Sequence, residues 1–165
     1  MKKCVYAGTF DPPTSGHRSV IEKCLKIFDN VVVAVMVNPE KEPFLTADER
    51  VALLKKLFCG NESVEVCAFS GAAVDLLERE QTPFYVRGVR DAIDLEYENR
   101  DRYASEKLKS DLITVYIPAE QDETHVSSSL VKNSVKFKKD FKNYVPAEIT
   151  TDFEEILRKK GLNYV

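Results

Sequence analysis

One stretch near the start of the chain combines glycine, hydroxyl and imidazole groups in a pattern suited to phosphate chemistry. It reads Gly8-Thr9-Phe10-Asp11-Pro12-Pro13-Thr14-Ser15-Gly16-His17 and lies between a β-prone run and a helical pattern. Gly8 allows the backbone to turn sharply and approach a ligand closely. The loop would deliver His17 into the first turn of a helix, beside unpaired N–H groups that favour an anion. We interpret His17 as a hydrogen-bond donor to a phosphate oxygen, and the alternative is a histidine that caps its own loop.

Cationic side chains follow two further β-prone runs. Arg87-Gly88-Val89-Arg90 comes after the run 84–86, and each of its guanidinium groups can hold a phosphate through two hydrogen bonds. The alternative is a pair of surface arginines. Lys41 follows the run 31–37 and would be a mobile cation beside the ligand. Taken by itself, it is more typical of an exposed surface lysine. Glu98 lies on the next helical segment, where a charged residue is more often solvated.

A serine run near the last third of the chain predicts a second phosphate site. The segment is His125-Val126-Ser127-Ser128-Ser129-Leu130-Val131-Lys132. Serines that lead into a helix supply an N-cap, several hydroxyls and unpaired N–H groups. The alternative is an ordinary N-cap with two spare serines. The lysine-rich stretch 132–142 is more typical of a solvated helix face.

β-prone and helical patterns alternate along the whole chain. The expected strands cover 3–7, 31–37, 64–69, 84–86 and 113–117, and the expected helices cover 17–28, 46–58, 71–80, 91–108, 127–137 and 146–159. This order predicts an α/β fold, a doubly wound, Rossmann-like five-stranded parallel sheet with helices on both faces. Such sheets bind ligands at the carboxyl ends of their strands, close to the point where the strand order reverses. We expect one domain over residues 1–165.

Composition limits the classes of function. The chain has 165 residues and a net charge of −3, which argues against a general nucleic-acid-binding protein. No apolar run is long enough to span a bilayer, and the first residues leave no room for a signal-peptide core. The four cysteines form no CxxC pair, so they favour neither a zinc site nor a disulfide framework. We therefore expect a cytoplasmic protein that binds neither membrane nor nucleic acid.

These motifs together resemble those of bacterial phosphopantetheine adenylyltransferases. The shared features are TSGH at 14–17, RGVR at 87–90, the FDP loop and HVSSSLVK at 125–132. TxGH alone marks only the nucleotidyltransferase superfamily with an HxGH-type motif, whereas the combination is far more specific. The resemblance covers nearly the whole chain. It implies transfer of the adenylyl group of ATP to 4′-phosphopantetheine, which gives dephospho-coenzyme A and pyrophosphate, by a cytoplasmic homohexamer that uses Mg²⁺.

The resemblance also implies a role for individual positions. His17 would stabilise the transition state, with Lys41 and Arg90 as further catalytic cations. The 4′-phosphopantetheine site would contain Thr9, Lys41, Ala73 and Arg87. The ATP site would contain Thr9, Phe10, His17, Gly88, Val89, Arg90, Glu98, Glu123, Thr124, His125, Val126, Ser127, Ser128 and Ser129. Glu123-Thr124-His125 replaces a stretch that is often aromatic in the family, and no magnesium ligands are implied.

The chemistry of such a transfer fits a chain without an obvious catalytic triad. A phosphomonoester has a second pKa of about 6, so the acceptor is already largely a dianion at neutral pH and needs no catalytic base. The alternatives are a sister nucleotidyltransferase, such as a nicotinamide mononucleotide adenylyltransferase or a cytidylyltransferase, and a non-catalytic nucleotide-binding module. A redox dinucleotide enzyme is disfavoured because GxGxxG does not follow the first strand.

Overall fold

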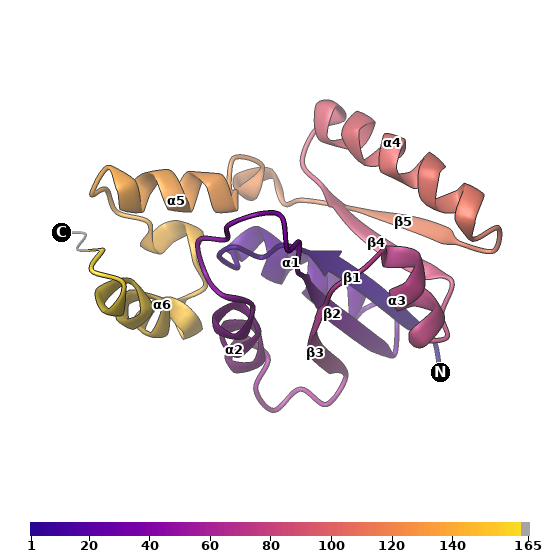
Figure 1. Ribbon diagram of the computed structural model, residues 1–165, viewed down its shortest axis with the longest axis horizontal. Helices are drawn as coiled ribbons and strands as arrows, with labels where there is room; N and C mark the ends of the chain where they lie inside the picture. Colours follow the sequence, from indigo (N-terminus) through magenta and orange to yellow (C-terminus); the bar gives the residue numbers. More distant parts are fainter. Residues whose placement is uncertain (163–165) are drawn as a thin grey trace.

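A five-stranded parallel sheet forms the centre of the protein in the computed structural model, which describes residues 1–162 except for the side chains of residues 100, 101 and 104 (Figure 1). The strands are β1 (Lys3–Gly8), β2 (Asn30–Met36), β3 (Val64–Phe69), β4 (Phe84–Val89) and β5 (Ile113–Pro118). Their order in the sheet is β3-β2-β1-β4-β5, and every neighbouring pair is parallel. The strand order therefore reverses between β1 and β4, which is where a sheet of this kind opens a crevice.

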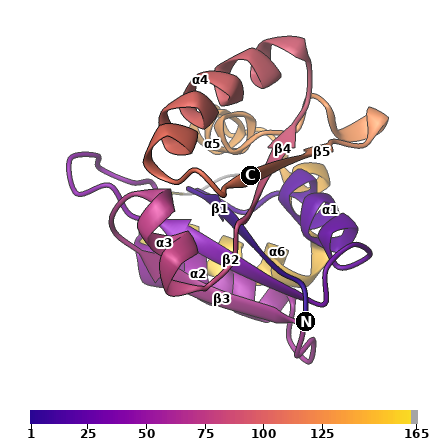
Figure 2. The ribbon, with the colours of Figure 1, turned by 90° about the vertical axis from the view of Figure 1, so that its right-hand side faces the viewer.

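Helices cover both faces of this sheet, as the sequence predicts. They are α1 (Ser15–Cys24), α2 (Ala47–Leu57), α3 (Ala73–Arg79), α4 (Ala92–Leu108), α5 (Ser128–Lys136) and α6 (Ala147–Lys159), with short 3₁₀ turns η1 (Gln121–Glu123) and η2 (Lys142–Tyr144). Figure 2 shows α1 and α3 on opposite sides of the strands. Within the described residues, each of these helices is too short or too polar to cross a membrane.

Alternating burial explains how the central strands hold the two layers together. In β1, Cys4 and Tyr6 face the cluster formed with α1, whereas Val5 faces the cluster formed with α3. Residues 31–35 of β2 are all at most 1% exposed, since helices cover both of its faces. Successive side chains of a strand point to opposite faces, so one apolar run supplies both cores.

A third apolar core lies beside the sheet and fixes the position of α5. It contains Leu53 of α2, Val131 and Val135 of α5, and Phe153 of α6, all nearly fully buried. Figure 1 shows α5 and α6 together at the end of the molecule farthest from α4. Because α2 contributes to this core, the start of α5 is held against the carboxyl edge of the sheet.

The predicted elements are confirmed, and their ends differ most at β4 and at the first helix. β4 continues through Arg87, Gly88 and Val89, which the sequence placed after the strand, because these residues pair with 116–118 of β5. The first helix begins at Ser15 rather than His17, since Thr14 caps it. It ends at Cys24 instead of Phe28, and the following turn carries Phe28 back into the core.

Candidate functional site

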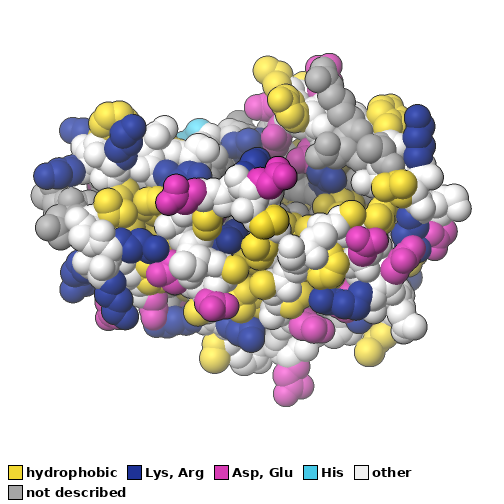
Figure 3. All heavy atoms as spheres, viewed as in Figure 1, with side chains coloured by type: hydrophobic (Ala, Val, Ile, Leu, Met, Phe, Trp, Pro, Cys, Tyr) yellow, Lys and Arg dark blue, Asp and Glu magenta, His cyan; other side chains and the backbone are white. Residues whose placement is uncertain are grey.

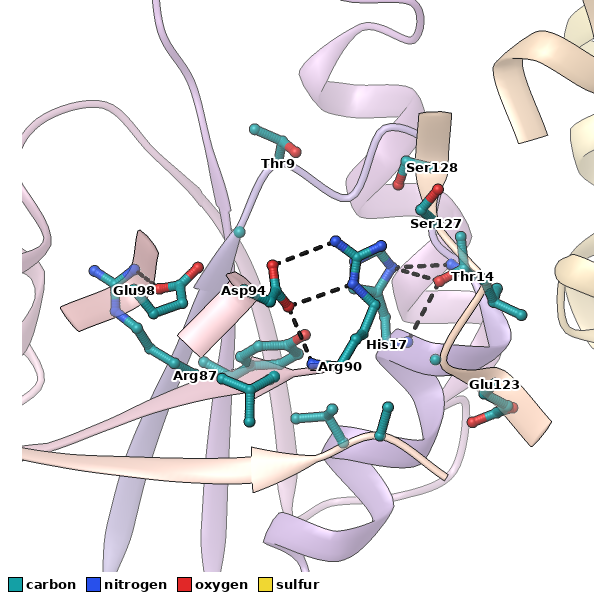
Figure 4. Close-up of a pocket in the computed structure, with 18 of the residues that line it drawn as sticks. Thr9, Thr14, His17, Arg87, Arg90, Asp94, Glu98, Glu123, Ser127 and Ser128 are labelled. Atoms are coloured by element: carbon teal, nitrogen blue, oxygen red, sulfur yellow. Dashed lines mark hydrogen bonds and ion pairs between the residues drawn. The ribbon is translucent and has the colours of Figure 1, made fainter. Parts of the chain in front are cut away.

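A cavity of about 390 Å³ opens at the carboxyl ends of β1 and β4, where the strand order reverses (Figure 4). Four segments form its walls: the end of β1 with the start of α1, the end of β4 with the first turns of α4, the segment around η1, and the start of α5. Their charged side chains come from different strands and helices and point toward one another. The cavity is therefore the place where the predicted phosphate-binding motifs meet.

His17 is held by the loop that precedes it. The backbone N–H of Thr14 donates to Nδ1 of His17 over 3.0 Å, and the Thr14 hydroxyl lies 3.0 Å from the same atom. The Thr14 hydroxyl also accepts from the His17 backbone N–H over 3.4 Å, which completes a capping box. The buried ring of Phe10 packs edge-on against the imidazole, with the ring centroids 4.9 Å apart. One ring nitrogen of His17 thus caps the loop, as the alternative interpretation expected, and the ring also lines the cavity.

The contacts of His17 determine its tautomer and its charge. A backbone N–H can only donate, so Nδ1 is the acceptor and the proton of the neutral ring lies on Nε2. Burial lowers the pKa of His17 to about 4, and the positive charge of Arg90 adds to the effect. At neutral pH the ring is uncharged and offers an Nε2–H donor. Such a donor suits an oxygen that gains negative charge during a reaction.

The lowered pKa of His17 makes the stability of the protein depend on pH. An unfolded histidine binds its proton near pH 6.5, whereas His17 in the folded chain binds it only near pH 4. Between these values the unfolded state holds more protons, so the free energy of unfolding should fall as pH decreases from about 6.5 to about 4. Urea denaturation across this range should show a shallower pH slope for His17→Gln than for the wild type. His125→Gln, outside the cavity, is the control, and an unchanged slope in His17→Gln would contradict the prediction.

Two arginines reach the cavity wall from β4, each beside a carboxylate of α4. Arg90 donates to Asp94 through its backbone N–H over 3.1 Å and through two guanidinium nitrogens over 3.3 Å. Arg87 forms an ion pair with Glu98, and its guanidinium lies over the ring of Tyr85 at 4.7 Å. These carboxylates keep the guanidinium groups at the cavity wall. A bound phosphate could compete for the same donors, since arginine recognises carboxylate and phosphate with the same fork of N–H groups.

The first turns of α1 and α5 meet at the opposite wall. The Ser127 side chain caps α5 by accepting from the Leu130 N–H over 3.1 Å, and the Ser128 hydroxyl donates to the carbonyl of Pro12 over 2.7 Å. A Cβ on Gly16 would lie 4.0 Å from the Val126 carbonyl, so the two helix starts are close neighbours. The N–H groups of a first helical turn have no intrahelical partner and carry partial positive charge. Two helix N-termini therefore face one cavity.

The structure brings most of the sequence-predicted residues into the cavity wall. Those that line it are Thr9, His17, Arg87, Gly88, Val89, Arg90, Glu98, Glu123, Val126, Ser127, Ser128 and Ser129. Five do not line it. Phe10 is buried behind His17, Lys41 is exposed on the loop after β2, and Ala73 begins α3. Thr124 is exposed, and the ring of His125 packs edge-on against Tyr144 at 5.9 Å.

Sequence reasoning missed several cavity residues. They are Tyr6, Ala7, Val20, Asp94 and Ala119, whereas Gly8, Thr14 and Gly16 belong to the motif that the sequence analysis identified. Asp94 lies four residues after Arg90, a spacing that on a helix start could have indicated the pair. Gly88 shows a role that the sequence did not reveal: an added Cβ would lie 3.0 Å from the Val20 side chain and 3.3 Å from the Tyr6 hydroxyl. The lack of a side chain there lets α1 pack against β4 under the cavity.

Comparison with known proteins gives consistent relatives over most of the chain. A family model described as cytidylyltransferase-like matches residues 5–134. A phosphopantetheine adenylyltransferase of Campylobacter hominis is 39% identical over 152 residues, which is 92% of this chain and 96% of the relative. A phosphopantetheine adenylyltransferase of Clostridium botulinum is 36% identical over 160 residues, which is 97% of this chain and 98% of the relative. Both relatives are thus matched over almost their entire length.

A solved structure confirms the fold. A crystal structure from Vibrio parahaemolyticus, provisionally assigned as a nicotinate-nucleotide adenylyltransferase, superposes with a TM-score of 0.71 and covers 98% of this chain and 95% of its own. Only 24% of the aligned residues are identical, so this likeness bears on architecture alone. The α/β arrangement is therefore one that an experimental structure also shows.

Proposed function

Because this chain belongs to the cytidylyltransferase-like family and, within it, to the phosphopantetheine adenylyltransferases, we propose that its cavity transfers the adenylyl group of ATP to 4′-phosphopantetheine. The products would be dephospho-coenzyme A and pyrophosphate. One observation carries the proposal: His17, Arg87, Arg90 and the N-termini of α1 and α5 converge on a single cavity. Such a convergence of cations and N–H donors suits two phosphate-bearing substrates held end to end.

The proposed reaction is a direct displacement at phosphorus. A phosphate oxygen of the acceptor attacks the α-phosphorus of ATP, a new P–O bond forms, and the bond to the β-phosphate oxygen breaks. Pyrophosphate leaves with the bonding electron pair. Since the acceptor is already largely a dianion at neutral pH, catalysis needs in-line positioning and positive charge rather than a base. No covalent intermediate with the protein is involved, and trapping a nucleotidylated protein would contradict this scheme.

The cavity residues divide into two groups in this proposal. The ATP phosphates would contact His17, Arg90 and the N–H groups of residues 127–129, while Gly88, Val89 and Glu123 would line the nucleotide side. Nε2–H of His17 would donate to the oxygen that becomes more negative in the transition state. The positive end of the α5 dipole would add to this attraction.

The acceptor would lie on the other side of the cavity. Arg87 would bind its phosphate, with Thr9 beside it, and Lys41 would close over it from the exposed loop. Ala73 packs in the same cluster as Ala7 and Met36, at the carboxyl ends of β1 and β2. The pantetheine arm would therefore run along this edge of the sheet toward the start of α3.

Magnesium fits the site as an ion carried mainly by the triphosphate. Among residues 1–162, apart from the three side chains left out, no group of three His, Cys, Asp or Glu residues could hold a metal by itself. Glu123 lines the cavity, and its Oε2 is buried without a hydrogen-bond partner among the described residues. Mg²⁺ commonly binds one or two carboxylates together with substrate phosphates, so Glu123 could supply one oxygen. When bound, the ion would neutralise phosphate charge.

We further propose that the chain assembles into a homohexamer. Among the side chains of the long helix α4 that the structure describes, four large apolar ones are strongly exposed: Ile93, Tyr97, Tyr103 and Leu108. Figure 3 shows several separate apolar side chains in the region of α4. Several large apolar side chains exposed on one helix are commonly found at protein interfaces. Light scattering coupled to gel filtration would measure the assembly, and a monomer at micromolar concentration would contradict the proposal.

A pyrophosphate-release assay tests the proposed function. The purified protein is incubated with ATP and Mg²⁺ and with one acceptor at a time: 4′-phosphopantetheine, nicotinamide mononucleotide or nicotinate mononucleotide. We expect release only with 4′-phosphopantetheine, and CTP should not replace ATP. Release with a mononucleotide would identify a sister nucleotidyltransferase. Tight ATP binding by calorimetry with no release from any acceptor would identify a non-catalytic nucleotide-binding module.

A further inference from the structure

Two buried charged residues outside the cavity wall join the loop after β1 to the loop after β2. They are Asp11, which is 7% exposed, and Arg50, which is 3% exposed. Each side chain hydrogen-bonds to the backbone of the other segment. We propose that Asp11 and Arg50 are positioning residues, which set the distance between the His17 side of the site and the Lys41 side. This inference rests on the proposed function.

Asp11 fastens the loop after β2 to the loop that precedes α1. Its Oδ2 accepts from the Phe44 backbone N–H over 2.8 Å, and its Oδ1 accepts from the Leu45 backbone N–H over 2.8 Å. Both carboxylate oxygens are thus engaged by consecutive peptide groups, which fixes the direction of the chain there. These groups come just before Thr46, the N-cap of α2, where the helix dipole favours a negative charge.

Arg50 makes the return connection from α2. Its guanidinium donates to the carbonyl of Thr9 over 2.8 Å and to that of Met36 over 3.5 Å, and its Nε donates to the Thr46 carbonyl over 3.2 Å. One side chain therefore holds the residue after β1, the last residue of β2 and the start of α2. Hydrogen bonds from a charged donor are stronger than those between neutral groups, so this junction is stiff.

The junction has a direct connection to the proposed chemistry. Thr9 lines the cavity, and the next residue, Phe10, has a left-handed backbone conformation (φ 48°) and packs its ring against His17. A shift of the Thr9 carbonyl would move the Phe10 ring and with it the imidazole. On the other side, Lys41 lies three residues before Phe44, on a loop that is exposed from Asn38 to Pro43. The contacts of Asp11 with the backbone of Phe44 and Leu45 hold the end of that loop that leads into α2.

These contacts contribute to stability as well as to geometry. An apolar side chain at either position would leave backbone N–H or C=O groups without their hydrogen-bond partner, which destabilises the fold. A charged side chain that hydrogen-bonds to defined backbone atoms adds a fixed geometry. Misplacement of a reacting group by about 1 Å can lower a rate about a hundredfold, so this geometry has a kinetic value.

A double-mutant cycle with Lys41 tests the role of Asp11. In Asp11→Asn the side chain keeps its size but loses one acceptor oxygen, so the loop that carries Lys41 is no longer held by two contacts. We expect the KM for 4′-phosphopantetheine to rise roughly tenfold, with a smaller change in the KM for ATP. In a Lys41→Ala background the same substitution should raise this KM by less than about twofold, because the two changes remove one effect.

A parallel cycle tests Arg50. Arg50→Met keeps most of the side-chain stem and removes the donors, and we expect kcat to fall roughly tenfold through the displaced Phe10 and His17. In a His17→Ala background Arg50→Met should have little further effect. Arg50→Lys, which keeps the charge and one donor group, should restore part of kcat. The Arg50 cycle also gives a second, independent measurement if Asp11→Asn does not fold.

Thr82→Val is the control for a purely structural loss. Thr82 is 5% exposed and lies near the amino ends of β1 and β4, away from the cavity. Its hydroxyl donates to the Lys3 carbonyl over 2.6 Å. This variant should lose thermal stability and keep wild-type KM and kcat for its folded fraction. The inference would be overturned if Asp11→Asn raised the KM for 4′-phosphopantetheine by the same factor with and without Lys41. Wild-type kinetics in folded Asp11→Asn and folded Arg50→Met would also overturn it. A wild-type protein that releases no pyrophosphate would instead refute the proposed function.

Discussion

Replacing His17 with alanine should lower kcat by roughly 10²–10³-fold while the KM for ATP changes little. The reason is that the neutral imidazole offers an Nε2–H donor whose hydrogen bond tightens as charge builds on the phosphate oxygen. Loss of one such donor typically costs this much in rate. Steady-state kinetics with saturating 4′-phosphopantetheine, read as pyrophosphate release, give both constants.

Two further observations make the His17 experiment decisive. The pKa of His17 is lowered to about 4, so the donor is the neutral ring and acidification to pH 6 should not increase kcat. Thr14→Val removes one contact to Nδ1 but keeps the backbone donor, and an intermediate loss is expected. If His17→Ala raised the KM for ATP tenfold and left kcat unchanged, the residue would contribute to ground-state binding only.

Replacing Arg87 with alanine should act mainly on the acceptor. We expect the KM for 4′-phosphopantetheine to rise about ten- to a hundredfold, the range for the loss of hydrogen bonds from a charged group. The KM for ATP and kcat should change far less, because Arg90 and the N-terminus of α5 lie on the ATP side of the proposed site. Initial-rate measurements with each substrate varied in turn would separate these effects.

Variants of the same ion pair supply the controls. Glu98→Gln removes the carboxylate that holds Arg87 in the absence of substrate, so the KM for the acceptor should not rise. Arg87→Lys keeps the charge but loses the planar fork, and it should lie between the wild type and alanine. Circular dichroism of each variant checks that it is folded. A loss of ATP affinity equal to the loss of acceptor affinity in Arg87→Ala would assign Arg87 to the nucleotide instead.

The alternation of strands and helices was readable from the sequence because each element carries a strong local pattern. The unbroken apolar run 31–37 predicted a doubly covered strand, and β2 is that strand. The end of β4 was predicted wrongly because Arg87 and Gly88 resemble loop residues. Pairing with β5, a contact distant in sequence, keeps them in the strand. The strand order itself depends on such distant contacts and could not be derived from local pattern.

The site was predictable where motifs follow strands and less so where helices cross the cavity. His17 and the run 127–129 were placed correctly by their position after β1 and β5. Asp94 was missed because a carboxylate on a highly charged helix is usually solvated, although its spacing of four residues from Arg90 is the local signal of the pair. Arg50 lies in no motif that distinguishes a buried contact from a surface charge, and Asp11 belongs to the FDP loop but received no role of its own from the sequence.

The hydroxyls of Ser127 and Ser128 have a consequence for how this enzyme family can change over time. Both are already engaged within the protein, one as a helix cap and the other with Pro12. The Ser128 proton is committed to Pro12, so this hydroxyl does not also donate to a phosphate. The peptide N–H groups of the first turn remain as donors at this end of the cavity, together with the hydroxyls of Ser127 and Ser129. Every amino acid except proline supplies a peptide N–H, so this part of the anion-binding capacity depends on backbone shape rather than on residue identity.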